Sequence, residues 1–299
     1  MDEELTSTDT DQEVVVASLG AGGSARTRTS GITPSISYRI ATSRTDLEAA
    51  YRLVHQQYTR RGYIEEHPSG LWLSIHNALP ETTTFIATLR YGEGQQKLLG
   101  TVTLVPDSPL GFPMDTIYRA ELDRLRSAGR RIGEVTMLAS HIDAAPLEGS
   151  GRLAIDRCRV FFTLFRLVFR EASARFGLDD LCIAIHPTHS LLYDQIGFQD
   201  FAPLVSYCRV NGNPALGKRV DLHTVRVRLA LGKRPAIYRV FFGQVSALVL
   251  DRPKFVMTPE DLAYFCLDQT ELLPQASQSV VEYLISRYRL YHSTKSILA

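Results

Sequence analysis

The chain of 299 residues has little of what marks several common classes of protein. Its four cysteines lie far apart without a Cys-x-x-Cys pair, so the sequence offers neither a zinc site nor a disulfide framework. No apolar run approaches the roughly 18 residues of a membrane span, and the acidic start MDEELTSTDTDQE is unlike a signal peptide. The formal net charge is only +1, which argues against nonspecific nucleic-acid binding. We expect a cytoplasmic protein with no nucleic acid, no transmembrane segment and no metal.

The composition allows a sizeable core, because 44% of the residues are hydrophobic and 22% are charged. Residues 1–36 differ from the rest: they are rich in Ser, Thr, Gly and acidic residues and lack the apolar periodicity that would offset the entropy of ordering. Beyond about residue 230 the pattern changes to helical segments such as SQSVVEYLISRYRLYH. We therefore predict a disordered leader at 1–36, a main domain at 37–230 and a C-terminal helical extension at 231–299.

Strand and helix signals alternate through the main domain, which predicts an α/β (α+β) fold. Strands are expected at 37–42, 84–90, 97–105, 133–139 and 181–187. Helices are expected from residue 45 and at 117–127, 153–176 and 190–198. Two more strands, YCRVNG and VDLHTVRVRLA, are predicted around an NGNP turn.

The strand GEVTMLA, residues 133–139, carries a carboxylate in an otherwise apolar segment. Burying a carboxylate is costly unless it has a partner or a function. In one interpretation Glu134 pairs with Arg130 or Arg131 at a sheet edge. In the other it lies in a cleft, where desolvation raises its pKa and lets it act as a general base.

Several motifs resemble one superfamily of enzymes. LLYDQIGF, residues 191–198, resembles the LYxKxGF signature of GCN5-related N-acyltransferases, and the order of elements up to about residue 229 is similar to that fold. This resemblance implies a mixed twisted sheet that is splayed between its fourth and fifth strands, so that a pantetheine arm lies between GEVTMLA and LCIAIHP. Glu134-Val135-Thr136-Met137 is similar to the Glu-x-Ser/Thr-Arg motif of acyl-homoserine-lactone synthases, with Met137 in place of the arginine.

Further segments resemble a narrower family over about residues 38–228. LPETTTFIATLR, LLGTVTLVPDSPLG and FQDFAPLVSYCRVNGNPA are similar to the long-chain N-acyl amino acid synthases of the N-acyltyrosine synthase type. The resemblance implies transfer of a long-chain fatty acyl group from the phosphopantetheine thioester of an acyl carrier protein to the α-amine of an amino acid. The acyl-phosphopantetheine is then a donor substrate, and no bound cofactor is expected.

This chemistry assigns roles to residues near the splayed strands. Glu134 is the expected general base, and Tyr193 the expected proton donor to the leaving thiolate, with simple packing as the alternative for Tyr193. Thr136 could hydrogen-bond the pantetheine arm, and the backbone N–H groups of Met137 and Leu138 could form the oxyanion site. Weaker predictions for the acceptor site are Arg52, Tyr58, Tyr63, His186 and His189, the two histidines having a capping role as the alternative.

Residues 151–175 contain six arginines and two acids, so this segment is basic. Its positive charge would attract an acidic acyl carrier protein. The predicted docking residues are Arg130, Arg131, Arg152, Arg157 and Arg159, each of which could instead belong to a solvated face. The C-terminal helices could form a homodimer interface.

Three other functions stay open. An acyl-homoserine-lactone synthase is disfavoured by Met137 and by threonines at 82–84, where acidic residues are expected. An acetyl-CoA acetyltransferase is disfavoured because only GSGR, residues 149–152, stands where a pyrophosphate-binding loop is expected. The last alternative is a noncatalytic module that binds or senses the acyl carrier protein.

Overall fold

The computed structural model describes residues 35–91, 95–141, 151–225 and 254–298, together with residues 227 and 231. The side chains of 151–157 and 291–298 are outside this description. The predicted leader therefore lies almost entirely outside the described residues. The predicted boundary between 230 and 231 also falls beside residues that are not described, so the division into domains stays a prediction.

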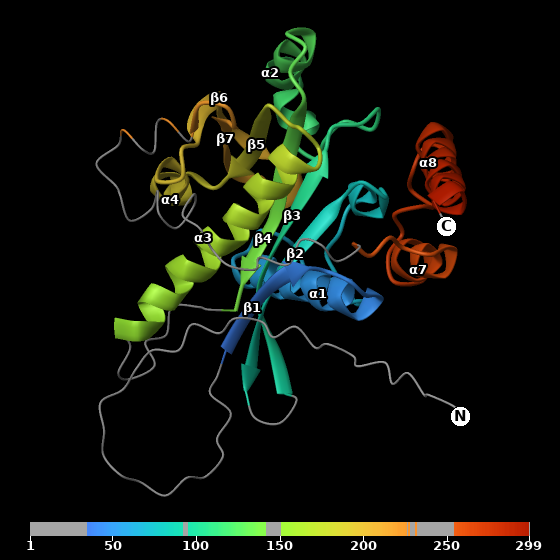
Figure 1. Ribbon diagram of the computed structural model, residues 1–299, viewed down its shortest axis with the longest axis horizontal. Coiled ribbons are helices and arrows are strands. Elements are labelled where there is room, and N and C mark those ends of the chain that lie inside the picture. The colour runs from blue at the N-terminus through green and yellow to red at the C-terminus, as the bar shows by residue number, and fades with distance from the viewer. Residues whose placement is uncertain are drawn as a thin grey trace, which may run out of the picture.

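Seven strands within the described residues form one mixed sheet in the order β1-β2-β3-β4-β5-β7-β6 (Figure 1). Their bounds are β1 Ser35–Ile40, β2 Thr83–Tyr91, β3 Gln95–Pro106, β4 Ile132–Ser140, β5 Asp180–Ile185, β6 Gln199–Tyr207 and β7 Asn213–Asp221. Strands β4 and β5 are parallel, and all other neighbouring pairs are antiparallel. The parallel pair is joined through a helical crossover, as parallel neighbours require.

Helices cover both faces of this sheet. The main helices are α1 Arg44–Arg60, α2 Asp115–Ser127, α3 Gly151–Ala174 and α4 Ser190–Asp194, and the C-terminal ones are α7 Pro259–Ala263 and α8 Gln278–Leu298. Short turns of helix are η1 Ile75–Ala78, η2 Pro187–His189, η3 Cys208–Val210 and the π-helical η4 Tyr264–Asp268. Helices α3 and α4 share one apolar core with the sheet, whereas α1 and α2 each pack in a separate core.

Helices α1 and α3 form where the apolar spacing predicts them. In α1, Leu47, Tyr51 and Val54 are buried at intervals of three to four residues. The cap is Ser43, two residues before the expected start, and its hydroxyl accepts a hydrogen bond from the N–H of Asp46 at 3.1 Å. In α3, Phe165 is fully buried in the core that the helix shares with the sheet.

The last two strands begin earlier in the chain than predicted. The NGNP turn is where the sequence places it, with Asn211 and Gly212 at φ of 52° and 71°. Tyr207 pairs with Asn213 across η3 and this turn, so residues 208–210 of the predicted strand YCRVNG are helical, and the strands extend away over 199–207 and 213–221. Residues 222–225 are not part of the sheet, because the Asp221 carboxylate accepts hydrogen bonds from the N–H groups of residues 223 and 224 and begins a turn.

The described part of the C-terminal extension packs on the α1 side of the same chain (Figure 1). The rings of Phe265 and Tyr51 meet edge to face at 5.4 Å, and the Tyr288 hydroxyl donates to the carbonyl of Ala78 at 2.8 Å. These apolar side chains are buried within one chain, so dimerisation through the exposed remainder of α8 stays a prediction. Among the described helices, none combines the length and hydropathy that a membrane crossing needs.

Candidate active site

Strands β4 and β5 pair only at their beginnings. The register joins Ile132 to Asp180 and ends with Glu134 opposite Cys182, after which the two strands separate. A cavity of about 320 Å³ opens where they part, within the size range of small-molecule sites. Its walls come from β4, β5, the end of α1, helices α3 and α4, and the turn between β6 and β7. The splay that the resemblance implied is therefore present.

A bulge in β4 lies beside this cavity. Thr103 pairs with Thr136 and Thr101 with Ala139, so one residue of β3 faces two residues of β4, Met137 and Leu138. Met137 has a φ of 54°, which is uncommon for a residue other than glycine.

The bulge also changes which core the side chains of β4 enter. Val135 packs in the core with α3, whereas Met137 and Ala139 pack in the core with α1. A regular strand would place all three on one face. The extra residue is left out of the ladder, so the N–H groups of Met137 and Leu138 stay the proposed oxyanion donors, next to Thr136 in the cavity wall.

Glu134 lines the cavity and is 3% exposed. Its Oε2 accepts a hydrogen bond from the backbone N–H of Met114 at 3.0 Å. Burial raises the pKa of Glu134 to about 8, although the Met114 hydrogen bond and the charge of Arg209 both act to lower it. A carboxyl group with this pKa can accept a proton from an ammonium group near neutral pH.

The interpretation of Glu134 as part of an edge ion pair does not hold, because the neighbouring arginines pair elsewhere. Arg130 contacts Asp180 at 2.5 Å and Asp221 at 3.0 Å, and the Arg131 guanidinium is 4.0 Å from Asp179. These contacts lie at the end where β4 and β5 are paired.

Neither Arg130 nor Arg131 lines the cavity, and their role in docking an acyl carrier protein stays a prediction. Arg159 is exposed on α3, one residue after the cavity-lining Cys158. The side chains of Arg152 and Arg157 are outside the described part of the chain.

An ion-pair network holds the loop that supplies the Met114 N–H group. Asp115 accepts a hydrogen bond from the N–H of Phe112 at 2.6 Å and pairs with Arg126 at 2.8 Å. Arg126 also pairs with Asp107 and Asp123. Burial acts to raise the pKa of Asp115, but the Arg126 and Phe112 hydrogen bonds outweigh it and lower the pKa. The loop is therefore anchored at both ends, at Asp107 and Asp115, by ion pairs with Arg126.

Tyr193, on α4, also lines the cavity. Its ring meets Phe161 and Phe165 of α3 edge to face at 5.5 and 5.6 Å. Burial raises the pKa of Tyr193, so its hydroxyl stays protonated near neutral pH. The packing role and the donor role are therefore compatible.

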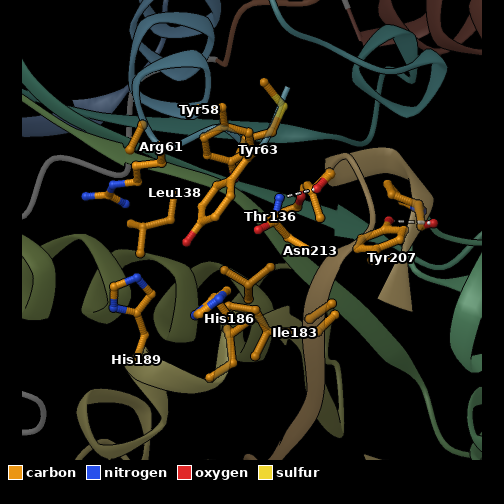
Figure 2. A pocket seen from close by; sticks show the side chains of 18 of the residues that line it. Tyr58, Arg61, Tyr63, Thr136, Leu138, Ile183, His186, His189, Tyr207 and Asn213 are labelled. Carbon is orange, nitrogen blue, oxygen red and sulfur yellow. Dashed lines mark hydrogen bonds between the residues drawn. The ribbon is translucent and has the colours of Figure 1, made fainter. Parts of the chain in front are cut away.

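Four of the predicted acceptor-site residues line the cavity (Figure 2). Tyr58 and Tyr63 meet edge to face at 5.7 Å, and Tyr63 stacks on His186 at 6.0 Å. The capping role is also real for His186, whose Nδ1 accepts a hydrogen bond from the N–H of Thr188 at 3.4 Å at the start of η2. Partial desolvation and the charge of Arg61 lower the pKa of His189.

Arg52 is the exception. It lies on the exposed face of α1, where its guanidinium pairs with Glu48 at 2.8 Å.

Sequence reasoning missed four cavity residues: Arg61, Tyr207, Arg209 and Asn213. Arg61 falls in the segment YTRRGY, one turn beyond Tyr58, and that spacing was a usable signal. The other three lie in the SYCRVNGN segment, which the pattern assigned partly to a strand. Their arrival at the cavity depends on the pairing of β7 with β5, which places the turn between β6 and β7 near β4.

The mixed sheet parts between β4 and β5, with a bulge and a buried carboxyl group at the parting, which is the arrangement that the resemblance to GCN5-related N-acyltransferases implied. The sequence pattern of the N-acyl amino acid synthase FeeM family matches residues 49–221, and the chain belongs to this family.

Two solved structures are similar to the chain. FeeM, an N-acyl amino acid synthase from uncultured soil microbes, is similar at 28% identity and a TM-score of 0.52, over 67% of this chain and 98% of that chain. The acyl-homoserine-lactone synthase LasI is similar at 17% identity and a TM-score of 0.45, over 72% of this chain and 96% of that chain. No curated protein matches the chain.

Proposed function

We propose that this enzyme transfers a fatty acyl group from the phosphopantetheine thioester of an acyl carrier protein to the α-amine of an amino acid. The observation that carries the proposal is the buried carboxyl group of Glu134, which lies in the cleft between the separated strands with a pKa raised to about 8. The name of the family that the chain belongs to supports an amino acid as the acceptor.

The first step is removal of a proton from the acceptor. An ammonium group has no lone pair, so it must lose a proton before it attacks the thioester. Glu134 accepts this proton. Its pKa of about 8 leaves roughly a tenth of the enzyme in the basic form at pH 7 and about half at pH 8. Activity should therefore increase with pH and level off above about pH 8.

The second step is attack on the thioester. The amine nitrogen forms a bond to the carbonyl carbon, and the carbonyl oxygen becomes an oxyanion. The N–H groups at the β4 bulge, on Met137 and Leu138, are the proposed donors to this oxyanion, and one such donor contributes about 3 kcal/mol in other enzymes. Collapse breaks the carbon–sulfur bond and releases the thiolate, the nitrogen loses its second proton to water, and Glu134 returns the first proton to solvent.

The Tyr193 hydroxyl is expected to donate a hydrogen bond to the leaving thiolate without transferring its proton. The thiol of a pantetheine arm has a pKa of about 8.5 by analogy with cysteine. Because burial raises the pKa of Tyr193, complete transfer of its proton to sulfur is uphill. We therefore assign to the Tyr193 hydroxyl a hydrogen bond to the thiolate, which takes its proton from solvent.

The donor side has apolar walls and an exposed cation. Val160, Phe161 and Leu164 of α3 line the cavity, which suits a pantetheine arm and the start of an acyl chain. Arg159 lies exposed on the same helix, where positive charge would speed encounter with an acidic carrier protein.

The test is a transfer assay with purified enzyme, an acyl carrier protein loaded with a fatty acyl group and each amino acid in turn, with products identified by mass spectrometry. The wild type should form N-acyl amino acids, and Glu134→Gln should lower kcat by 10²- to 10⁴-fold. Glu282→Gln is a matched control, because Glu282 is exposed on α8. A wild type that acylates no amino acid, or a Glu134→Gln variant as active as the control, would refute the proposal.

A further inference from the structure

Two arginines line opposite parts of the cavity. Arg61 follows α1, and Figure 2 shows it on the same side as His189 and Leu138. Arg209 lies in η3, two residues after Tyr207, and Figure 2 shows Tyr207 on the side of the cavity away from Arg61. The two arginines also act on the pKa values of different groups. Arg61 acts on the pKa values of Tyr58, His189 and Tyr193, whereas Arg209 acts on those of Glu134, Tyr207 and His76.

Hydrogen bonds hold the Arg209 turn in place relative to Glu134. The Tyr207 hydroxyl donates to the carbonyl of Pro113 at 3.0 Å, and the next residue, Met114, donates its N–H to Glu134. On the other side of Arg209, the amide of Asn213 donates to the carbonyl of Val210 at 2.7 Å and to that of Gly62 at 3.1 Å. The backbone of Arg209 is thus tied both to the loop that binds the base and to the turn after α1.

The Arg209 guanidinium faces this cavity without an anionic partner from the described ranges of the chain. The nearby carboxylate of Asp115 is committed to Arg126 at 2.8 Å. His76 is held neutral near pH 7, because burial and the charge of Arg209 lower its pKa to about 4. A half-buried arginine in such a site is suited to bind a carboxylate through two parallel hydrogen bonds.

We infer that Arg209 binds the α-carboxylate of the acceptor amino acid and so selects α-amino acids over amines that lack a carboxylate. The inference rests on the proposed function and deepens it. An amino acid carries its carboxylate next to its ammonium group, and the cavity offers a guanidinium and a carboxyl base in one region. The zwitterion therefore binds in one orientation, with its amine directed at Glu134.

This arrangement also couples binding to base strength. In the free enzyme the positive charge of Arg209 lowers the pKa of Glu134. When a substrate carboxylate neutralises that charge, the pKa of Glu134 rises and the group becomes a stronger base. An acceptor without a carboxylate leaves Arg209 charged and lacks this effect.

The test compares one amino acid that the wild type acylates with its carboxamide, which keeps the amine and side chain and loses the negative charge. We expect the wild type to prefer the acid in kcat/KM by about 100-fold, as a charged bidentate contact provides. Arg209→Gln should lower kcat/KM for the acid by about 100-fold and change that for the amide by less than threefold. Arg209→Lys should recover part of the preference, because it keeps the charge and loses the planar fork.

Arg61→Gln is the matched control, because it removes a cavity arginine at the other side and should leave the ratio of acid to amide unchanged. Equal losses for acid and amide in Arg209→Gln would overturn the inference and indicate a structural role. A wild type that acylates both equally well would also overturn the inference while leaving acyl transfer to amines intact. A wild type that acylates neither would instead refute the proposed function.

Discussion

Ionisation of Glu134 should destabilise the fold, and a neutral isostere should remove this cost. The folded protein holds the Glu134 carboxyl with a pKa raised from 4.5 to about 8, and burial is the main cause. Between these two values the folded state binds a proton more tightly than the unfolded state. The stability contributed by the neutral carboxyl is present below the unfolded pKa and is lost as the pH rises towards the folded pKa.

The size of the effect follows from the two pKa values. Because protonation is linked to folding, the free energy of unfolding of the wild type falls, relative to its value in acid, by about 1 kcal/mol at pH 5 and about 3 kcal/mol at pH 7. Glu134→Gln keeps the shape of the side chain and does not ionise. The difference in free energy of unfolding between Glu134→Gln and the wild type should therefore shift in favour of the variant by about 2 kcal/mol between pH 5 and pH 7. The acyl transfer activity of the variant should fall.

The assay is urea unfolding of wild type, Glu134→Gln and the control Glu282→Gln at half-unit steps from pH 5 to pH 8, with the urea midpoint and the slope m fitted at each step. Stability curves for Glu134→Gln and wild type that stay parallel over this range would show that Glu134 titrates normally. That result would refute both the buried position and the role as a base. The control should follow the wild type throughout.

Three further predictions concern other parts of the site. Gly111→Ala should lower the free energy of unfolding by about 2 kcal/mol and also lower kcat, because φ at this residue is 67° and a Cβ would overlap the Asp115 carboxylate; unfolding at the wild-type midpoint would contradict this. Arg159→Glu should raise KM for the acylated carrier about tenfold at low salt and less at high salt, whereas Arg131→Glu, at the paired end of β4, should not; equal effects would exclude docking at α3. Tyr193→Phe should lower kcat about tenfold with little change in unfolding; wild-type turnover would leave Tyr193 a packing role alone.

The sequence predicted the order of elements and the special character of β4 because both depend on local patterns. Alternation identified the strand at 133–139, and an acid in such a strand requires an explanation wherever the strand lies. The apolar spacing of α1 and α3, the hairpin between β2 and β3 and the NGNP turn are also encoded within a few residues. The family resemblance used these same motifs.

Tertiary structure decided what depends on neighbours distant in the chain. The alternating pattern of β4 places Val135 and Met137 on the same face. The bulge puts them in different cores, and it is visible only in the pairing of β4 with β3. Charge along the chain could not show that Arg130 pairs with Asp180 at the closed end of β4. Pairing of β7 with β5, which itself pairs with β4, carries Arg209 to the cavity of Glu134 from 75 positions away in the sequence.

The carboxyl group at position 134 was thus determined by the sequence alone, whereas its pKa was not. A raised pKa needs the exclusion of water, and helices, sheet and loop must meet around the side chain to achieve this. Identity and periodicity are local properties that a sequence carries directly. Burial and electrostatic environment are properties of the assembled chain, because each contact that creates them joins residues that only folding brings together.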